Sequence, residues 1–104
     1  MIKVKWSKNA TVELLSITDY WTKRNKSTNY SLKIRAHIDI AINLIKKNHR
    51  LGIQSNINDV HMRLILKNYY LIYGVSEKQI DILQFWDARQ NPIKTKFEPK
   101  ESDR

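Results

Sequence analysis

The chain has 104 residues, a formal net charge of +9, 41% hydrophobic residues and no cysteine. This length and composition predict one globular domain and exclude an intrinsically disordered chain, disulfides and thiolate metal sites. No apolar run is long enough to cross a membrane, and the N-terminus lacks the apolar core of a signal peptide, so we expect a cytoplasmic protein.

The positive charge lies almost entirely in the first half of the chain. Residues 1–50 hold eleven Lys or Arg and three Asp or Glu, which gives a net charge of +8. Residues 51–104 hold eight Lys or Arg and seven Asp or Glu, which gives +1. A basic balance of this size favours an acidic partner, either a nucleic acid or an acidic protein.

A short strand and a helix are predicted at the start of the chain. Apolar residues alternate with lysines from Ile2 to Trp6, a pattern typical of a strand with one solvated face. Ser7 or Asn9 is expected to cap a helix over about residues 10–24. One side of this helix carries an apolar stripe, which consists of Ala10, Leu14, Ile17 and Trp21.

A second, longer helix follows, capped by Ser27 or Thr28 and extending to about Asn48. Its main apolar stripe is formed by Ile34, Ile38, Ala41 and Ile45. Ile40 and Leu44 widen the apolar surface around the side, which indicates contact with a second element or with a partner. Gly52 fits the exit turn, and residues 53–59 are expected to be a polar connection.

The last third of the domain is predicted to be a meander of three strands over residues 60–67, 69–75 and 79–86. Asn68 marks the first turn, and residues 76–78 mark the second. Val60, Met62, Leu64 and Leu66 share one face of the first strand, and His61, Arg63, Ile65 and Lys67 share the other. Arg63 and Arg89 lie among apolar residues, where a guanidinium needs water, an anion or a carboxylate.

The predicted fold is α+β, with the order β-α-α-β-β-β and a helical hairpin packed on one face of a small twisted antiparallel sheet. The other face of the sheet is then available for function. Residues 1–92 form the domain, and residues 93–104 are expected to be a partly mobile tail. The expected core consists of Ile17, Trp21, Ile34, Ile38, Ala41, Leu64, Ile72 and Ile82.

Several stretches match a known family pattern: RLIL at 63–66, NYYLIY at 68–73, IDIL at 80–83 and WDARQNP at 86–92. Together with VKWS at 4–7 and Ala10, they resemble the RelE/ParE superfamily of bacterial toxins from type II toxin–antitoxin pairs. The resemblance implies the fold described above. It also implies a cognate antitoxin that wraps the toxin with an extended and often acidic segment.

Members of one branch, the RelE-like toxins, cleave mRNA in the ribosome. The candidate catalytic residues for this mRNA interferase activity are His61, Arg63, Asp87 and Arg89, with a base activating the ribose 2′-hydroxyl and arginines stabilising the phosphate charge. The sequence departs from these nucleases, because residues 51–62 contain no Lys, Asp87 replaces a histidine and no Tyr follows Arg89. His61 is therefore the one obvious general base of the meander.

The thin set of nuclease residues favours the other branch, the ParE-like toxins, which inhibit growth by poisoning DNA gyrase without catalysis. Whether the chain is an enzyme stays open, and a non-toxic nucleic-acid-binding module is a third alternative. No cofactor and no metal are expected, since His37 and His49 are too far apart for one ligand face and no glycine-rich loop exists. The predicted partner-binding residues are Ile40, Leu44, Arg63, Lys67, Trp86 and Arg89.

Overall fold

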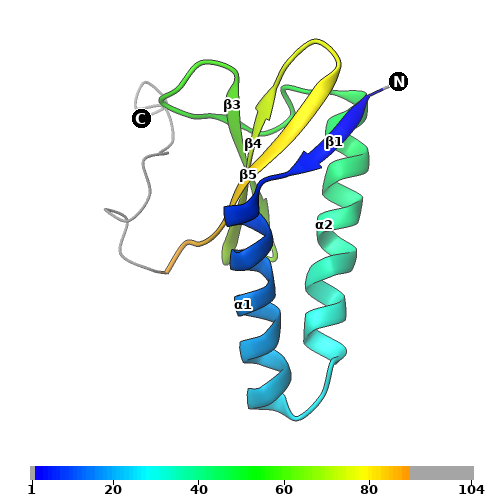
Figure 1. Cartoon of the computed structure of the whole chain (residues 1–104), viewed down its shortest axis with the longest axis vertical. Helices are drawn as coiled ribbons and strands as arrows, with labels where there is room; N and C mark the ends of the chain where they lie inside the picture. The colour runs from blue at the N-terminus through cyan, green and yellow to red at the C-terminus, as the bar shows by residue number, and fades with distance from the viewer. Residues whose placement is uncertain (1, 90–104) are drawn as a thin grey trace.

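A computed structural model describes residues 2–89, which form two helices and a five-stranded sheet (Figure 1). The helices lie side by side as an antiparallel hairpin against one face of the sheet. The elements in chain order are β1 (Lys3–Trp6), α1 (Lys8–Asn25), α2 (Asn29–Lys47), β2 (Ile53–Gln54), β3 (Val60–Ile65), β4 (Tyr69–Val75) and β5 (Gln79–Asp87).

Both predicted helices are present, and their ends follow from local chemistry. The Ser7 hydroxyl caps α1 by accepting the Ala10 N–H at 3.0 Å, as predicted, and it donates to the Leu83 carbonyl at 3.0 Å. Lys26 ends α1 in the left-handed region, at φ 52°. Where the helices meet, Ser31 donates to the Thr18 carbonyl at 2.7 Å, because small side chains allow the two backbones to approach closely.

The sheet has the strand order β1-β5-β4-β3-β2 and is mixed. The strands β3 to β5 pair antiparallel, as expected, and β2 pairs antiparallel with β3. The strand β1 instead pairs parallel with β5, from Lys3 opposite Gln79 to Trp6 opposite Ile82. The parallel pairing was not predicted, because alternation along a strand does not specify its partner. The segment expected to be a polar connection contributes the two-residue strand β2.

The main core fills the space between the helices and the sheet. Ile34, Ile38, Ala41 and Ile82 are buried there as predicted, and Ile17 and Trp21 are half-buried against it. The sheet contributes a row of fully or almost fully buried side chains, which are Ile65, Tyr69, Leu71, Tyr73, Ile80, Ile82 and Phe85.

Two predicted core residues lie elsewhere. Leu64 is 47% exposed, and Ile72 is buried in a second cluster on the opposite face of the sheet, with Met62 and Trp86. The alternation along β3 was predicted correctly, but its faces were assigned the wrong way round. Because Ile65 packs toward the helices, the alternate residues Arg63 and His61 lie on the helix side of the sheet and not on the uncovered face.

A β-bulge in β5 sets which of its side chains reach the core. Ile72 pairs with Gln84, whereas the next residue, Tyr73, pairs with Ile82, so Leu83 is the extra residue. The bulge places Ile82 and Phe85 on the helix side and Leu83 and Trp86 on the other. The predicted tail, residues 93–104, and the last residues of the predicted domain lie outside the described residues. Neither described helix is long and apolar enough to span a membrane.

Candidate functional site

The four candidate catalytic residues do not come together. His61 lies opposite Tyr73 on β4, whereas Asp87 lies opposite Tyr69, four residues further along the same strand. At about 3.3 Å per residue, this places the two side chains roughly 13 Å apart along the sheet, with a strand between them. The Asp87–Arg89 pair and His61 therefore occupy opposite ends of the helix-covered face.

His61 is enclosed at its end of the sheet. It is 3% exposed and stacks on the Tyr73 ring, with the ring centroids 5.6 Å apart and the planes at 19°. Its Nδ1 atom makes no hydrogen bond to the described residues. Burial, assisted by the charge of Arg50, lowers the pKa of His61 below 6.5, although Asp59 acts in the opposite direction. The imidazole is therefore neutral at pH 7 and shielded from a substrate.

The neighbouring Tyr73 hydroxyl anchors the connection from α2 to β2. It accepts the Gly52 N–H at 3.0 Å and donates to the His49 carbonyl at 3.1 Å. A Cβ atom at position 52 would lie 2.8 Å from the Met62 carbonyl oxygen, so only glycine fits this close approach. The polar groups at this end of the sheet therefore fix the connection from α2 to β2 against β4.

Asp87 and Arg89 form an ion pair at the other end. Arg89 donates from Nε to Oδ1 and from Nη2 to Oδ2 of Asp87, each at 3.0 Å, and its backbone N–H donates to Oδ1 at 2.9 Å. Burial opposes ionisation of Asp87, but the hydrogen bonds from Arg89 outweigh it and lower the pKa of Asp87. The Arg89 guanidinium, which was expected to need water, an anion or a carboxylate, thus pairs with a carboxylate two sequence positions away.

Tyr69 joins this ion pair to α1. Its hydroxyl accepts a hydrogen bond from Trp21 Nε1 at 2.8 Å and a longer one from Arg89 Nη2 at 3.4 Å. The Arg89 guanidinium lies 5.7 Å from the centre of the Tyr69 ring. Burial raises the pKa of Tyr69, so its hydroxyl stays protonated at neutral pH.

A cavity of about 510 Å³ lies beside Arg89, between α1 and the end of β5. We call it the aromatic cavity, and it is lined by Ser16, Ile17, Tyr20, Trp21, Arg24, Asp87 and Arg89. The sequence prediction missed it, although Tyr20 and Arg24 are four residues apart and therefore on one side of α1.

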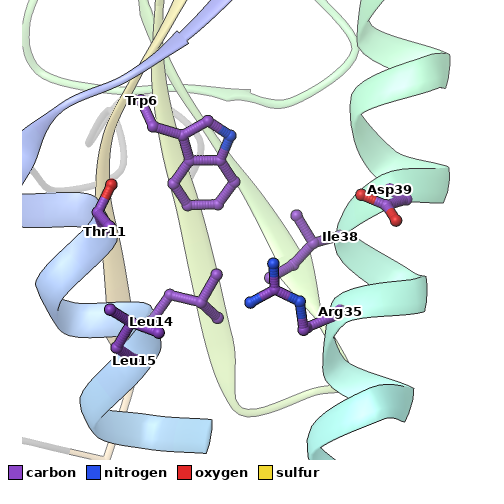
Figure 2. Close-up of a pocket in the computed structure, with 7 residues that line it drawn as sticks. All are labelled: Trp6, Thr11, Leu14, Leu15, Arg35, Ile38 and Asp39. Carbon is purple, nitrogen blue, oxygen red and sulfur yellow. The ribbon is translucent and has the colours of Figure 1, made fainter.

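A second cavity, of about 250 Å³, lies between the two helices, and we call it the interhelical cavity. Figure 2 shows Leu14 and Leu15 on the α1 side, Ile38 on α2 and the Trp6 ring between them. The Arg35 side chain extends from α2 into the space between the helices. Arg35 and Asp39 are four residues apart on α2 but form no ion pair among residues 2–89. An apolar cavity with an available guanidinium is suited to an apolar segment that carries a carboxylate.

Residues 4–92 of the chain match the family described as "ParE toxin of type II toxin-antitoxin system, parDE". The chain belongs to this family.

Solved structures with the same fold include proteins of such systems. A chain of the "Chromosomal ParDE TA system from P. aeruginosa" superposes with a TM-score of 0.70 and 21% identity, covering 86% of this chain and 98% of that one. The "YoeB/ParE toxin from Agrobacterium tumefaciens" superposes with a TM-score of 0.59 and 14% identity, covering 83% of this chain and 98% of that one. The YoeB dimer from Staphylococcus aureus superposes with a TM-score of 0.59 and 22% identity, covering 82% of this chain and 94% of that one. Among curated proteins, none matches the sequence.

The predicted partner-binding residues of this ParE-family chain do not form one surface. Ile40 and Leu44 are exposed on α2, by 57% and 39%. Arg63 is half-buried on the helix side of β3, whereas Trp86 is 9% exposed on the opposite face of the sheet. Lys67 is exposed in the β3–β4 turn, and Arg89 lines the aromatic cavity. The prediction therefore selected residues from five separate places.

The described residues contain no cluster of three or more His, Cys, Asp or Glu side chains that would hold a metal ion.

Proposed function

We propose that this ParE-family chain is the toxin of a type II toxin–antitoxin pair that acts in the cytoplasm by binding DNA gyrase without catalysis. The observation that carries the proposal is the placement of His61, which is buried and is displaced from the Asp87–Arg89 pair by roughly 13 Å along the strands, with β4 between them. Asp87, with its lowered pKa, is a weak base. The four candidate catalytic residues thus do not form an accessible acid–base pair, and a toxin that acts by binding does not need one.

The proposed resting partner is a cognate antitoxin with an acidic, amphipathic segment. The interhelical cavity supplies apolar walls from Leu14, Leu15 and Ile38, and Arg35 supplies a positive charge at the same place. The net charge of +8 in residues 1–50, which include both helices, attracts an acidic segment to this side of the molecule. An amphipathic helix laid along a groove is one established way to bind such a surface.

The proposed target is tested by inducing the chain in a host and measuring DNA supercoiling and mRNA integrity in the same cells. A gyrase poison is expected to change supercoiling while transcripts stay intact during the first minutes of growth arrest. Cleaved transcripts with normal supercoiling would establish the RelE-like ribosome-dependent endoribonuclease instead. Normal growth with folded protein present would exclude both toxin functions.

His61→Ala separates the two branches further. A nuclease with His61 as its base would lose roughly 10²–10⁴-fold in cleavage rate. A gyrase poison is expected to keep its toxicity per folded molecule. Because His61 is buried, circular dichroism must first show how much of the variant is folded, and toxicity is compared at equal amounts of folded protein.

The antitoxin surface is tested with two leucines of similar exposure. Leu15, which is 55% exposed, lines the interhelical cavity, whereas Leu32, which is 60% exposed, does not. Leu15→Glu is expected to give a toxin that the antitoxin no longer neutralises, and Leu32→Glu a toxin that it still neutralises. Full neutralisation of the Leu15→Glu variant would place the antitoxin elsewhere.

A further inference from the structure

We propose that the aromatic cavity binds a nucleotide unit of a single-stranded nucleic acid. This site is distinct from the interhelical cavity and from His61, and it does not depend on which target the toxin inhibits. The inference rests on the guanidinium groups and aromatic rings that line the cavity, and on the adjoining edge of β5, where a backbone donor is already bound by a side chain.

Two arginines of the aromatic cavity are available to a phosphate. Asp87 occupies Nε and Nη2 of Arg89, and among residues 2–89 the Nη1 atom has no hydrogen-bond partner. The Arg89 side chain is 50% exposed, so its remaining N–H groups are accessible. Arg24 is exposed on the α1 wall and forms no ion pair within the described residues. Asp87 thus fixes the position of one guanidinium without using all its donors.

The aromatic wall provides a place for a base. Tyr20 is 54% exposed, and its ring packs edge-on against Trp21, with the centroids 5.1 Å apart and the planes at 82°. Trp21 is itself held by its hydrogen bond to Tyr69 and by a second edge-on contact with Tyr30. An exposed ring on a rigid support, with arginines beside it, is the arrangement on which unpaired bases stack.

The size of the cavity and the chemistry of its edge favour a nucleotide over a peptide strand. About 510 Å³ is within the range of small-ligand sites, and twice the volume of the interhelical cavity. A peptide strand added to the adjoining edge of β5 needs the backbone donors of that edge. The Phe85 N–H on this edge already donates to the Glu13 carboxylate, at 2.9 Å. A peptide strand added here would therefore lack one of the backbone N–H donors that it needs, whereas a stacked base and a bound phosphate do not need that donor.

The test is fluorescence anisotropy of labelled oligonucleotides of roughly 10 nucleotides with the full-length chain, using single-stranded DNA, single-stranded RNA and duplex DNA. Tyr20→Ala is expected to weaken single-strand binding roughly 5- to 100-fold, and Tyr20→Phe to restore it, because phenylalanine keeps the stacking face. Arg24→Gln is expected to lower affinity and to reduce the slope of log affinity against log salt by about one.

Lys78→Gln is the matched control, since it removes one positive charge from the opposite end of the nine-residue strand β5. That end is roughly 30 Å from Arg89, beyond the range of screened charge interactions, so binding is expected to stay within about twofold of the parent. Equal losses in Lys78→Gln and Arg24→Gln would show a diffuse electrostatic attraction and overturn the proposal. So would unchanged binding by Tyr20→Ala, equal affinity for duplex DNA, or binding of polyglutamate but of no oligonucleotide.

Discussion

The two ends of the helix-covered sheet face use the same residue type for different purposes. Tyr73 and Tyr69 are both fully buried on β4, four residues apart on one face. The Tyr73 hydroxyl binds backbone groups of His49 and Gly52, and so secures the connection after α2. The Tyr69 hydroxyl binds side chains, Trp21 and Arg89, that line an open cavity.

This difference shows how to separate polar groups that maintain the fold from those available for binding. At the closed end, His61 has almost no exposure and no room for a ligand. At the open end, the charge of Asp87 is compensated by Arg89, and half of the arginine side chain still reaches solvent. The neighbour of a polar group, and not its residue type, decides its role.

The largest expected effect on stability concerns the core between the helices and the sheet, which lies next to both ends. Ile38 is 2% exposed beneath α2, so Ile38→Ala is expected to lower the free energy of unfolding by about 2–5 kcal/mol through lost burial and a cavity. The control Ile40→Ala, at a position 57% exposed, is expected to change it by less than about 0.5 kcal/mol. Urea denaturation measures both, and a loss below about 1 kcal/mol for Ile38→Ala would contradict the position of α2.

The next test compares the two tyrosines directly. Tyr73→Phe leaves the Gly52 N–H and the His49 carbonyl without their partner and is expected to cost about 1–3 kcal/mol. Tyr69→Phe removes one short hydrogen bond, from Trp21, and is expected to cost about 1 kcal/mol. Urea denaturation of both variants is the measurement. A larger loss of unfolding free energy for Tyr69→Phe than for Tyr73→Phe would show that the open end, and not the closed end, maintains the fold.

The two ends also differ in the pH range over which they affect stability. The pKa of His61 is lower in the folded chain than its ordinary value of 6.5, so the unfolded chain takes up a proton first as the pH falls. The free energy of unfolding is therefore expected to decrease as the pH falls below about 6.5. The lowered pKa of Asp87 stabilises the folded chain above about pH 3.8, the ordinary pKa of the group, and this stabilisation is lost only at lower pH.

Thermal unfolding between pH 7 and pH 3 measures both contributions. His61→Leu is expected to remove much of the decrease that begins near 6.5, and Asp87→Asn only the decrease at lower pH. A His61→Leu variant with the same pH dependence as the parent would show that folding does not lower the pKa of His61.

The smallest expected effect on stability is at Arg89. The Arg89 side chain of this ion pair is 50% exposed, so Arg89→Ala is expected to change the free energy of unfolding by less than about 1 kcal/mol. Toxicity per folded molecule is expected to fall, because the variant loses the guanidinium beside the aromatic cavity. Melting temperature and growth arrest are measured together, and a clear loss of melting temperature would assign Arg89 to the fold.

Much of the fold was predictable from local patterns. The spacing of Ile34, Ile38 and Ala41 identified the buried side of α2, and Ser7 was predicted as a cap. The face of β3 was not predictable in the same way, because both of its alternating sets are partly apolar. Leu64 and Ile65 are equally hydrophobic by type, and only the position of the helices decides that Ile65 is buried.

The candidate site was harder to predict, since its residues are brought together by pairing between distant strands. Neither the displacement of His61 from Asp87 by roughly 13 Å along the strands nor the contact of Trp21 with Tyr69 follows from the residues next to them in sequence. The Asp87–Arg89 pair is the exception, because Arg89 follows the end of β5 by two residues and an Asp side chain readily accepts the backbone N–H two residues on. That local signal was available and indicated a partner for Arg89.

The parallel pairing of β1 with β5 has a consequence for synthesis on the ribosome. The Ser7 hydroxyl and the Leu83 carbonyl that it binds are 76 positions apart, so the first strand waits for almost the whole domain to be translated. At about 5–20 residues per second, this delay is roughly 4–15 s. A ribosome that stops before β5 releases a chain whose first strand and first helix lack their sheet partner. Incomplete translation products of this gene are therefore expected to be degraded without harming the cell.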